Sequence, residues 1–186
     1  GDSNPGVTTS NFTYSGLISG DTGAAVSAAA DFGSITSSTN VGSYNVGASF
    51  TSANYTVTNA PTTTLTINKR NITASVDNAS RAYGDPNSVL NWSSVTWSNL
   101  ANGEDGSVID SLTFSSPTAT ATSNAGTTHA LSISGLSDNN YNLTSSTAGT
   151  LSIGKRDITA SVNIASRAYG DANPVFTWAD VTWSNL

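Results

Sequence analysis

The sequence predicts an all-β protein built from tandem antiparallel β-sandwich repeats of about 86 residues that are joined by short linkers. Three observations carry this prediction. A long segment occurs twice in nearly identical form, apolar residues alternate with polar ones in short runs, and clusters of Gly, Asn, Asp and Pro separate those runs. No stretch of the sequence shows sustained helical periodicity.

The internal repeat defines the unit of the fold. KRNITASVDNASRAYGD begins at Lys69, and KRDITASVNIASRAYGD begins at Lys155, 86 positions later. VTWSNL recurs at the same offset, at Val95–Leu100 and Val181–Leu186. A repeat of this length is too long for one coil of a solenoid and has the size of a small sandwich domain.

The N-terminal residues belong to a further copy, because Gly1–Leu17 aligns without gaps with Gly170–Leu186. We therefore expect a first repeat that lacks its opening strand at 1–70, a complete repeat at 71–156, and the N-terminal part of a third repeat at 157–186. The sequence contains no Met, so we expect it to be a segment of a longer protein.

The strands of the complete repeat follow from alternation. Ile72, Ala74 and Val76 alternate with polar residues, which is typical of a half-buried strand. Further strands are expected at 90–92, continuing with a change of phase into 95–97, and at 108–114, 129–133, 141–143 and 151–153. Four residues, 154–157, separate the last strand from the next opening strand, and a joint this short restricts swinging between repeats.

The octapeptide SRAYGDPN, which recurs as SRAYGDAN, is interpreted as a structural corner. Its members are Arg81, Tyr83, Gly84 and Asp85, with Arg167, Tyr169, Gly170 and Asp171 in the second copy. Gly84 tolerates positive φ, and Asp85 can accept hydrogen bonds from the backbone just beyond it. We expect Tyr83 to bury its ring while its hydroxyl reaches the backbone, and Arg81 to pair with a carboxylate. A catalytic or metal site is the alternative, and the duplication favours the corner.

All six cationic residues lie at a joint or next to a corner. They are Lys69, Arg70, Arg81, Lys155, Arg156 and Arg167. This placement indicates pairing at fixed structural points rather than a surface for polyanions.

The composition excludes several functions. The formal charge of −6 and the pI near 4.3 exclude nucleic acid as a partner, because nucleic acid requires a basic face. Without Cys there are no disulfides or thiolate metal sites. No apolar run approaches the roughly 20 residues of a membrane span, so we expect no membrane insertion of this segment. Nucleophile, base and metal candidates occur only as lone residues, and we expect no enzymatic activity.

The candidates for ligand contact are the four tryptophans Trp92, Trp97, Trp178 and Trp183. Their rings could form a sugar-stacking platform, although large rings also dominate small cores, and packing is the favoured role. His129, the single histidine, has no Ser or acid constellation around it. We expect no cofactor, but turn acids such as Glu104 and Asp105 leave calcium binding open.

The R-x-YGD-x-NP corner, the ITAS opening strand, the NxG turns at 40–42 and 124–126, and the NY…L-x-I closing strand together resemble the MBG domain, YGX type. The sequence departs from that pattern at Pro86-Asn87, where NP is inverted, and at Trp97 and Trp183, where smaller residues are more usual.

That resemblance implies immunoglobulin-like modules in a large secreted bacterial surface protein of the filamentous haemagglutinin-like adhesin type. It implies a semi-rigid stalk or adhesive segment on the extracellular bacterial surface. The partners that it implies are adjacent repeats of the chain, host or biofilm glycans and other adhesin copies. A carbohydrate-binding module that uses the tryptophans is the alternative function. The sequence leaves open the ligand, glycosylation and oligomeric state.

Overall fold

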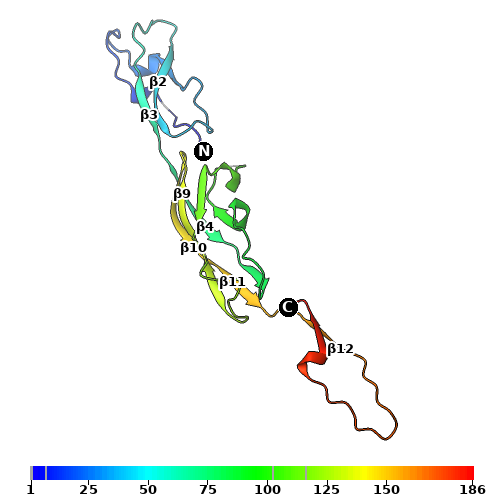
Figure 1. Ribbon diagram of the computed structural model, residues 1–186. Coiled ribbons are helices and arrows are strands. Elements are labelled where there is room, and N and C mark those ends of the chain that lie inside the picture. The colour runs from blue at the N-terminus through cyan, green and yellow to red at the C-terminus, as the bar shows by residue number, and fades with distance from the viewer. Residues whose placement is uncertain (1, 7, 102, 116) are drawn as a thin grey trace. The chain divides into compact units, whose positions relative to one another are not determined.

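The described part of the chain, residues 2–6, 8–101, 103–115 and 117–186 of a computed structural model, is all-β, as the sequence predicts (Figure 1). Its strands are β1 Ser27–Asp31, β2 Gly42–Thr51, β3 Thr63–Ile67, β4 Arg70–Val76, β5 Ala79–Ala82, β6 Val95–Ser98, β7 Ser111–Phe114, β8 Thr128–Leu131, β9 Ile133–Ser137, β10 Tyr141–Thr147, β11 Gly149–Gly154, β12 Thr159–Val162 and β13 Val181–Ser184. Its helices are 3₁₀ turns of three residues each: η1 Thr9–Asn11, η2 Gly23–Ala25, η3 Trp92–Ser94, η4 Gly106–Val108 and η5 Trp178–Asp180.

The chain forms two compact units that interleave along the sequence. One comprises Gly1–Ala74, Thr96–Leu112 and Gly135–Ser145, and the other comprises Ser75–Val95, Thr113–Ser134 and Ser146–Leu186. Because each unit takes part of the expected complete repeat, this division does not test the repeat boundaries, which remain a prediction.

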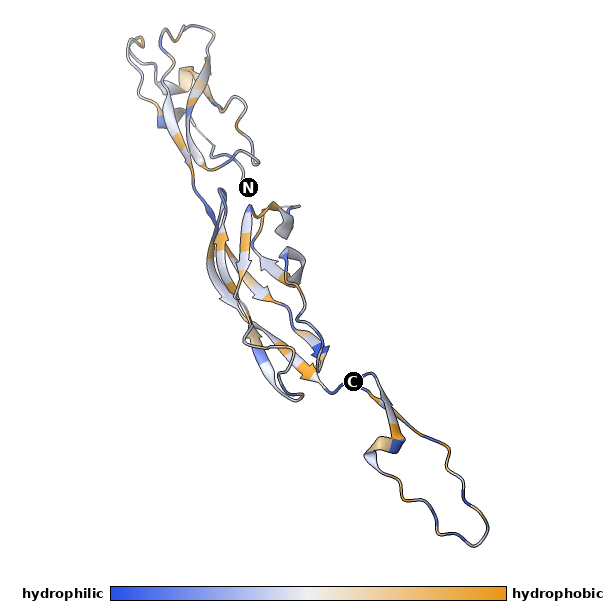
Figure 2. Cartoon of the chain, viewed as in Figure 1, coloured by the Kyte–Doolittle hydropathy of each residue, from blue (hydrophilic) through white to orange (hydrophobic). Residues whose placement is uncertain are grey.

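The strands of residues 70–154 form small sheets in the orders β10-β4-β6, β5-β11-β8 and β7-β9. Alternation in β4 buries Ile72 completely, at 0% exposed, with Ala74 and Val76 on the same face. Figure 2 shows how short hydrophobic stretches alternate with hydrophilic ones along the strands of the chain. Val76 joins Leu131 and Leu151 in a cluster of buried hydrophobic residues. The opening strand therefore supplies one side of the core, as its sequence pattern predicts.

One strand pair departs from the expected antiparallel arrangement. β5 and β11 are parallel, with Ala79 opposite Leu151 and Ala82 opposite Gly154. β5 is the first half of the octapeptide, so SRA is paired strand and the break in the chain begins at Tyr83.

The prediction of a strand at 90–92 is wrong. Asn91 caps η3 instead, because its side chain accepts a hydrogen bond from the Ser93 N–H at 2.9 Å while Ser94 returns one to the Asn91 N–H. Val108 likewise ends η4, which Asp105 caps, so the strand expected from 108 begins only at Ser111. Polar caps override alternation at both places.

Short elements recur at the offsets of the sequence repeat. η1 and η2 lie 83 positions before η3 and η4, and η5 lies 86 positions after η3. Asn99 directly follows β6 and Asn185 directly follows β13, and Gly16 is the aligned residue of the first repeat. All three have positive φ, at 71°, 65° and 84°. Equal spacing in the sequence therefore corresponds to equal local backbone geometry.

Candidate functional site

The YGD turn has one backbone geometry in both copies. Gly84 and Gly170 have φ of 88° and 90°, which confirms the predicted need for glycine. The Asp85 N–H donates to the Ala82 carbonyl at 3.2 Å, and the Asp171 N–H donates to the Ala168 carbonyl at 3.2 Å. The turn forms even in the second copy, where the octapeptide is exposed and unpaired with any described strand.

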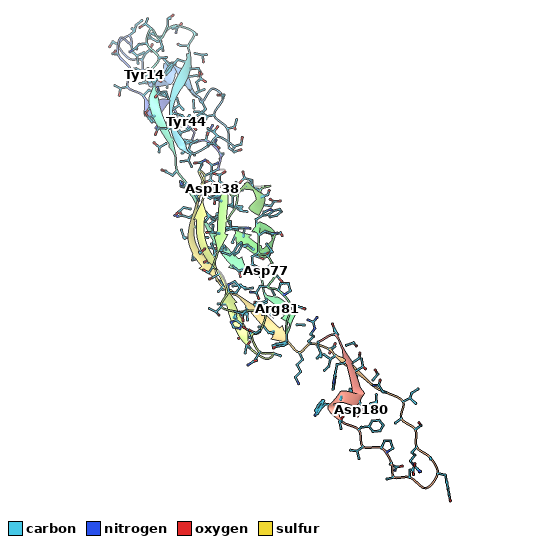
Figure 3. The ribbon with its side chains drawn as sticks, in the orientation of Figure 1. Tyr14, Tyr44, Asp77, Arg81, Asp138 and Asp180 are labelled. Atoms are coloured by element: carbon cyan, nitrogen blue, oxygen red, sulfur yellow. The ribbon has the colours of Figure 1, made fainter. Side chains whose placement is uncertain are left out.

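Arg81 fastens the first of these turns to the rest of its unit (Figure 3). The side chain is only 8% exposed and donates to the Asn87 Oδ1 at 2.9 Å, the Ala82 carbonyl at 3.1 Å and the Thr120 carbonyl at 2.6 Å. Asn87 in turn donates to the Ala119 carbonyl at 2.9 Å. The expectation that Arg81 pairs with a carboxylate is wrong, because these acceptors are amide and backbone oxygens.

Arg167 repeats the local part of this network. It donates to the Asn173 Oδ1 at 2.8 Å and to the Ala168 carbonyl at 3.3 Å. Here Asp171 supplies a third acceptor, its carbonyl, at 3.2 Å. The Arg–Asn hydrogen bond between residues six positions apart is thus a local property of the octapeptide. The contact with Thr120 is present in the first copy, where the arginine is buried.

Tyr83 does not have the expected role. Its ring is 41% exposed, and the ring of Tyr169 is fully exposed. The backbone of Tyr83 is what contributes, because its N–H donates to the Gly154 carbonyl at 3.0 Å and its carbonyl accepts from Arg156 at 3.2 Å. The corner is held by main-chain bonds and arginines rather than by a buried phenol.

A linker arginine contacts the corner aspartate. The Arg156 Nη1 lies 2.7 Å from the Asp85 Oδ1, and both side chains are partly exposed. The same guanidinium donates from Nε to the Asn185 carbonyl at 2.9 Å and from Nη2 to the Asn185 Oδ1 at 3.3 Å. Asp85 therefore accepts from the linker instead of from the backbone just beyond it. Arg156 connects the corner of one repeat with the positive-φ asparagine of the next.

The same bridge is present one repeat earlier. The Arg70 Nη1 lies 3.0 Å from the Asp2 Oδ1, and Arg70 donates to the Asn99 carbonyl at 2.9 Å and to its Oδ1 at 3.2 Å. Asp2 is the counterpart of Asp85 in the alignment of the N-terminus with the octapeptide. We call Asp2, Arg70 and Asn99 the first joint, and Asp85, Arg156 and Asn185 the second joint.

In each joint the asparagine also donates a hydrogen bond to the backbone just after the linker arginine. The Asn99 Nδ2 donates to the Asn71 carbonyl at 2.7 Å, and the Asn185 Nδ2 donates to the Asp157 carbonyl at 2.6 Å. Sequence reasoning missed both asparagines. A usable signal was Gly16 at the aligned position of the first repeat, because Gly and Asn share a tolerance for positive φ.

Further polar contacts surround the first joint. The Lys69 Nζ donates to the Asp138 carbonyl at 2.6 Å, and the Asn140 Oδ1 accepts from the Val41 N–H at 3.0 Å. The Asn140 Nδ2 donates to the Asn40 Oδ1 at 3.0 Å. An open pocket of about 400 Å³ lies here, lined by polar groups that include Asp2, Arg70, Glu104 and Asn140.

Buried Tyr141 lies beside this pocket and donates its hydroxyl hydrogen bond to Glu104, while the hydroxyl oxygen accepts from the Ala101 N–H at 3.0 Å. Burial and the bond to Glu104 raise the pKa of Tyr141 above its ordinary value of 10.0.

The turn acids are occupied by protein donors. The buried Asp138 carboxylate accepts from the Asn140 and Tyr141 N–H groups at 2.7 and 2.8 Å, and from the Asp110 N–H at 3.1 Å (Figure 3). Asp105 accepts from the Ser107 hydroxyl and N–H, which lowers its pKa. Among the described residues, no three His, Asp or Glu side chains gather as metal ligands. The geometry assigns these acids to turns.

The two tryptophans of the complete repeat differ in exposure. Trp97 is half-buried beside Gly106, where a Cβ would lie 2.3 Å from its Nε1, while Trp92 is exposed on η3. Trp178 and Trp183 stack with ring centroids 5.8 Å apart, and Trp178 is 81% exposed. His129 lies on β8 with its Nδ1 2.8 Å from the Thr118 hydroxyl.

No helix among the described residues has the length and apolar character needed to cross a membrane. Comparison with curated proteins and with solved structures found no match. Comparison with protein families found that residues 72–152 match the MBG domain (YGX type). The match begins within β4, ends within β11, and includes the octapeptide with Arg81 and Asp85. The match bears out the resemblance inferred from the sequence for this segment: residues 72–152 are similar to the MBG domain of the YGX type.

Proposed function

We propose that the chain is a structural stalk and adhesive segment of a secreted bacterial cell-surface adhesin, in which immunoglobulin-like β-sandwich modules follow one another as a semi-rigid rod. The observation that carries the proposal is the repeated joint. Two linker arginines, 86 positions apart, each bridge a corner aspartate and a positive-φ asparagine with nearly the same distances. A catalytic centre would not need to recur in this way, whereas a modular extension needs the same connection at each step.

The physical role of the bridge is orientation rather than stability. Its ion pairs are open to solvent, with the Asp85 side chain 45% and the Asp2 side chain 92% exposed, and exposed pairs contribute about 0–1 kcal/mol. The guanidinium nevertheless has fixed donor directions, and it uses Nε and Nη2 on one repeat and Nη1 on the other. An arginine held from both sides limits the angles that the short linker can adopt.

Small-angle X-ray scattering tests this proposal on the chain as it exists. We expect the unmodified chain to scatter as an extended particle. In the double variant Arg70→Ala, Arg156→Ala we expect scattering from a more flexible particle with a broader range of conformations. The matched control is Lys155→Ala, which removes an exposed cation from the same linker. A compact globule, or identical scattering from the double variant and the control, would refute the semi-rigid connection.

Extracellular placement is tested separately, by labelling intact bacteria with antibodies against residues 72–152. Binding without permeabilisation is expected, and binding only after lysis would contradict the proposal.

The Trp178–Trp183 stack supports a second candidate, a carbohydrate-binding module. An exposed pair of indoles is a surface on which a sugar ring can stack. In the complete repeat the counterpart Trp97 packs on Gly106, so the platform is confined to residues 178–183. Glycan-array binding that Trp178→Ala and Trp183→Ala abolish would favour this function, and binding that survives both changes would remove it.

A further inference from the structure

The NxG turn of the first repeat, residues 40–42, lies beside the linker. In the register of β2 and β3, Gly42 is opposite Ile67, the last residue of β3, and the linker follows directly. The same placement recurs in the complete repeat, where the Gly126 N–H donates to the carbonyl of Ile153 near the end of β11 at 2.8 Å. The NxG turn therefore lies at the end of the closing strand in both repeats.

A second turn reaches the linker from the complete repeat. The buried Asp138 carboxylate fixes this turn, because it accepts from the N–H groups of Asn140 and Tyr141 at 2.7 and 2.8 Å. The Asn140 carbonyl in turn accepts from the N–H of Arg70, the first residue of β4, at 2.8 Å. The backbone of Asn140 is thus held where the linker enters the complete repeat.

The side chain of Asn140 joins the two turns. Its Oδ1 accepts from the Val41 N–H at 3.0 Å, and its Nδ2 donates to the Asn40 Oδ1 at 3.0 Å. Both partners of the side chain belong to the preceding repeat, and all three residues lie within one compact unit. A carboxamide suits this position because it presents an acceptor and a donor side by side.

Both halves of this contact recur in the sequence. Asn40 of the NVG turn corresponds to Asn124 of the NAG turn, and Asn140 of the NY pair corresponds to Asn54. Each repeat thus carries both the turn asparagine and the strand asparagine. A head-to-tail contact between successive copies needs this arrangement, because each copy must supply one half to each neighbour.

The asparagine contact and the arginine bridge are separate contacts across the same linker. Asp2 and Arg70 line the open pocket of about 400 Å³ at the first joint, and Val41 and Asn140 line it as well. Open space therefore adjoins both contacts. One contact across a short linker permits rotation about that contact, whereas two contacts at different places restrict it.

We propose that Asn140 is a positioning residue of the first joint, and that its amide and the turn at 40–42 form a second clamp, which prevents rotation about the Arg70 bridge. The partner that this turn fits is the turn at 138–141 of the adjacent repeat. The inference rests on the proposed semi-rigid connection and divides the work within it. The arginine bridge keeps the two repeats together, and the amide clamp fixes the angle between them.

Amide hydrogen exchange at Val41 tests the contact in the full chain. Asn140→Ala removes the acceptor of the Val41 N–H and should speed its exchange about 10-fold or more. Asn40→Ala removes only the second hydrogen bond and should have a smaller effect. Asn139→Ala is the matched control and should leave the Val41 rate unchanged, because the Asn139 side chain donates to Asp110 within its own repeat.

Residual dipolar couplings test the positioning role, which the loss of a purely local hydrogen bond would not affect. In the unmodified chain the first and the complete repeat should share one alignment tensor. In Asn140→Ala the tensor magnitudes of the two repeats should differ by about 1.4-fold or more, as when a rigid connection becomes flexible. Asn139→Ala should keep them equal. Circular dichroism of Asn140→Ala should match the unmodified chain, because the backbone bonds of this turn do not involve the amide.

An unchanged Val41 exchange rate in Asn140→Ala, or equal tensor magnitudes in that variant, would overturn the inference. Arg70→Ala separates this failure from a failure of the proposed function. If the magnitudes become unequal in Arg70→Ala but stay equal in Asn140→Ala, the clamp is wrong and the proposed connection through arginine stands. Unequal magnitudes already present in the unmodified chain would contradict both.

Discussion

Replacing Arg81 by Ala should destabilise the complete repeat strongly, whereas the same change at Arg167 should have little effect. The two arginines occupy the same position of the same octapeptide. Arg81 is buried and reaches the Thr120 carbonyl across the unit at 2.6 Å, while the acceptors of Arg167 are exposed and lie within six residues of it. Comparing the two variants separates the free energy that the local hydrogen bonds of the motif contribute from the free energy that its burial contributes.

The magnitude follows from the bonds that are lost. A hydrogen bond from a charged donor contributes about 1.5–3 kcal/mol, and the bonds to Asn87 and Thr120 are the two that link Arg81 to other parts of its unit. Losing both should cost about 3–5 kcal/mol, part of it because the Thr120 carbonyl loses its donor. The exposed Arg167 bonds compete with water and should contribute less than about 0.5 kcal/mol.

Urea unfolding, followed by far-ultraviolet circular dichroism, measures the difference. With a slope of about 1–1.5 kcal/mol/M for a domain of this size, Arg81→Ala should lower the midpoint by about 2–5 M. Arg167→Ala should leave the midpoint of the complete repeat unchanged. A shift below about 0.5 M for Arg81→Ala, or equal shifts for both variants, would refute the assignment of Arg81 as the buried fastening of the corner.

Three further predictions concern the complete repeat and the second joint. Gly149→Ala should destabilise the complete repeat by about 1–3 kcal/mol through overpacking, because a Cβ at this position would lie 2.4 Å from the Asp77 carbonyl oxygen. Gly154→Ala is the control: its Cβ would meet its nearest atom at 3.8 Å, and the urea midpoint should stay nearly unchanged. The pKa of Tyr141 is raised in the folded state, so the hydroxyl's contribution to stability is complete below pH 10.0 and is lost as pH rises through the folded pKa. Tyr141→Phe should therefore make stability fall less steeply at alkaline pH. An alkaline fall as steep as that of the unmodified chain would contradict this. Asp85→Asn should change stability by less than about 1 kcal/mol but increase the mobility of residues 157–186 in ¹⁵N relaxation, and unchanged relaxation would argue against the second joint.

The sequence was sufficient where local chemistry decides the structure. The alternation of Ile72, Ala74 and Val76 predicts a strand with one buried face, and Gly84 predicts a positive φ. Both depend on a few neighbouring residues. The concentration of arginines at joints also pointed to the bridges, because charge at a fixed place in every copy indicates a fixed partner.

The remaining features depend on residues far apart in the chain. Nothing within the octapeptide shows that β11 will pair in parallel with β5, that Thr120 will accept from Arg81, or that Arg156 will take Asp85 as its partner. The capped turn at Trp92–Ser94 was missed for a different reason. Asn91 and Ser94 form a capping box, but alternating apolar residues at 90 and 92 gave the stronger pattern.

Distance measurement between spin labels across the first joint tests most directly the claim that a linker arginine fixes successive repeats. Thr51 and Ser145 are exposed, lie on either side of the linker, and can be changed to Cys in a sequence that has none. We predict a narrow distance distribution in the otherwise unmodified chain and a clearly broader one when Arg70→Ala is added, with Lys69→Ala as a second variant that leaves the bridge in place. A broad distribution already present with Arg70 intact, or a width that Arg70→Ala leaves unchanged, would contradict the account.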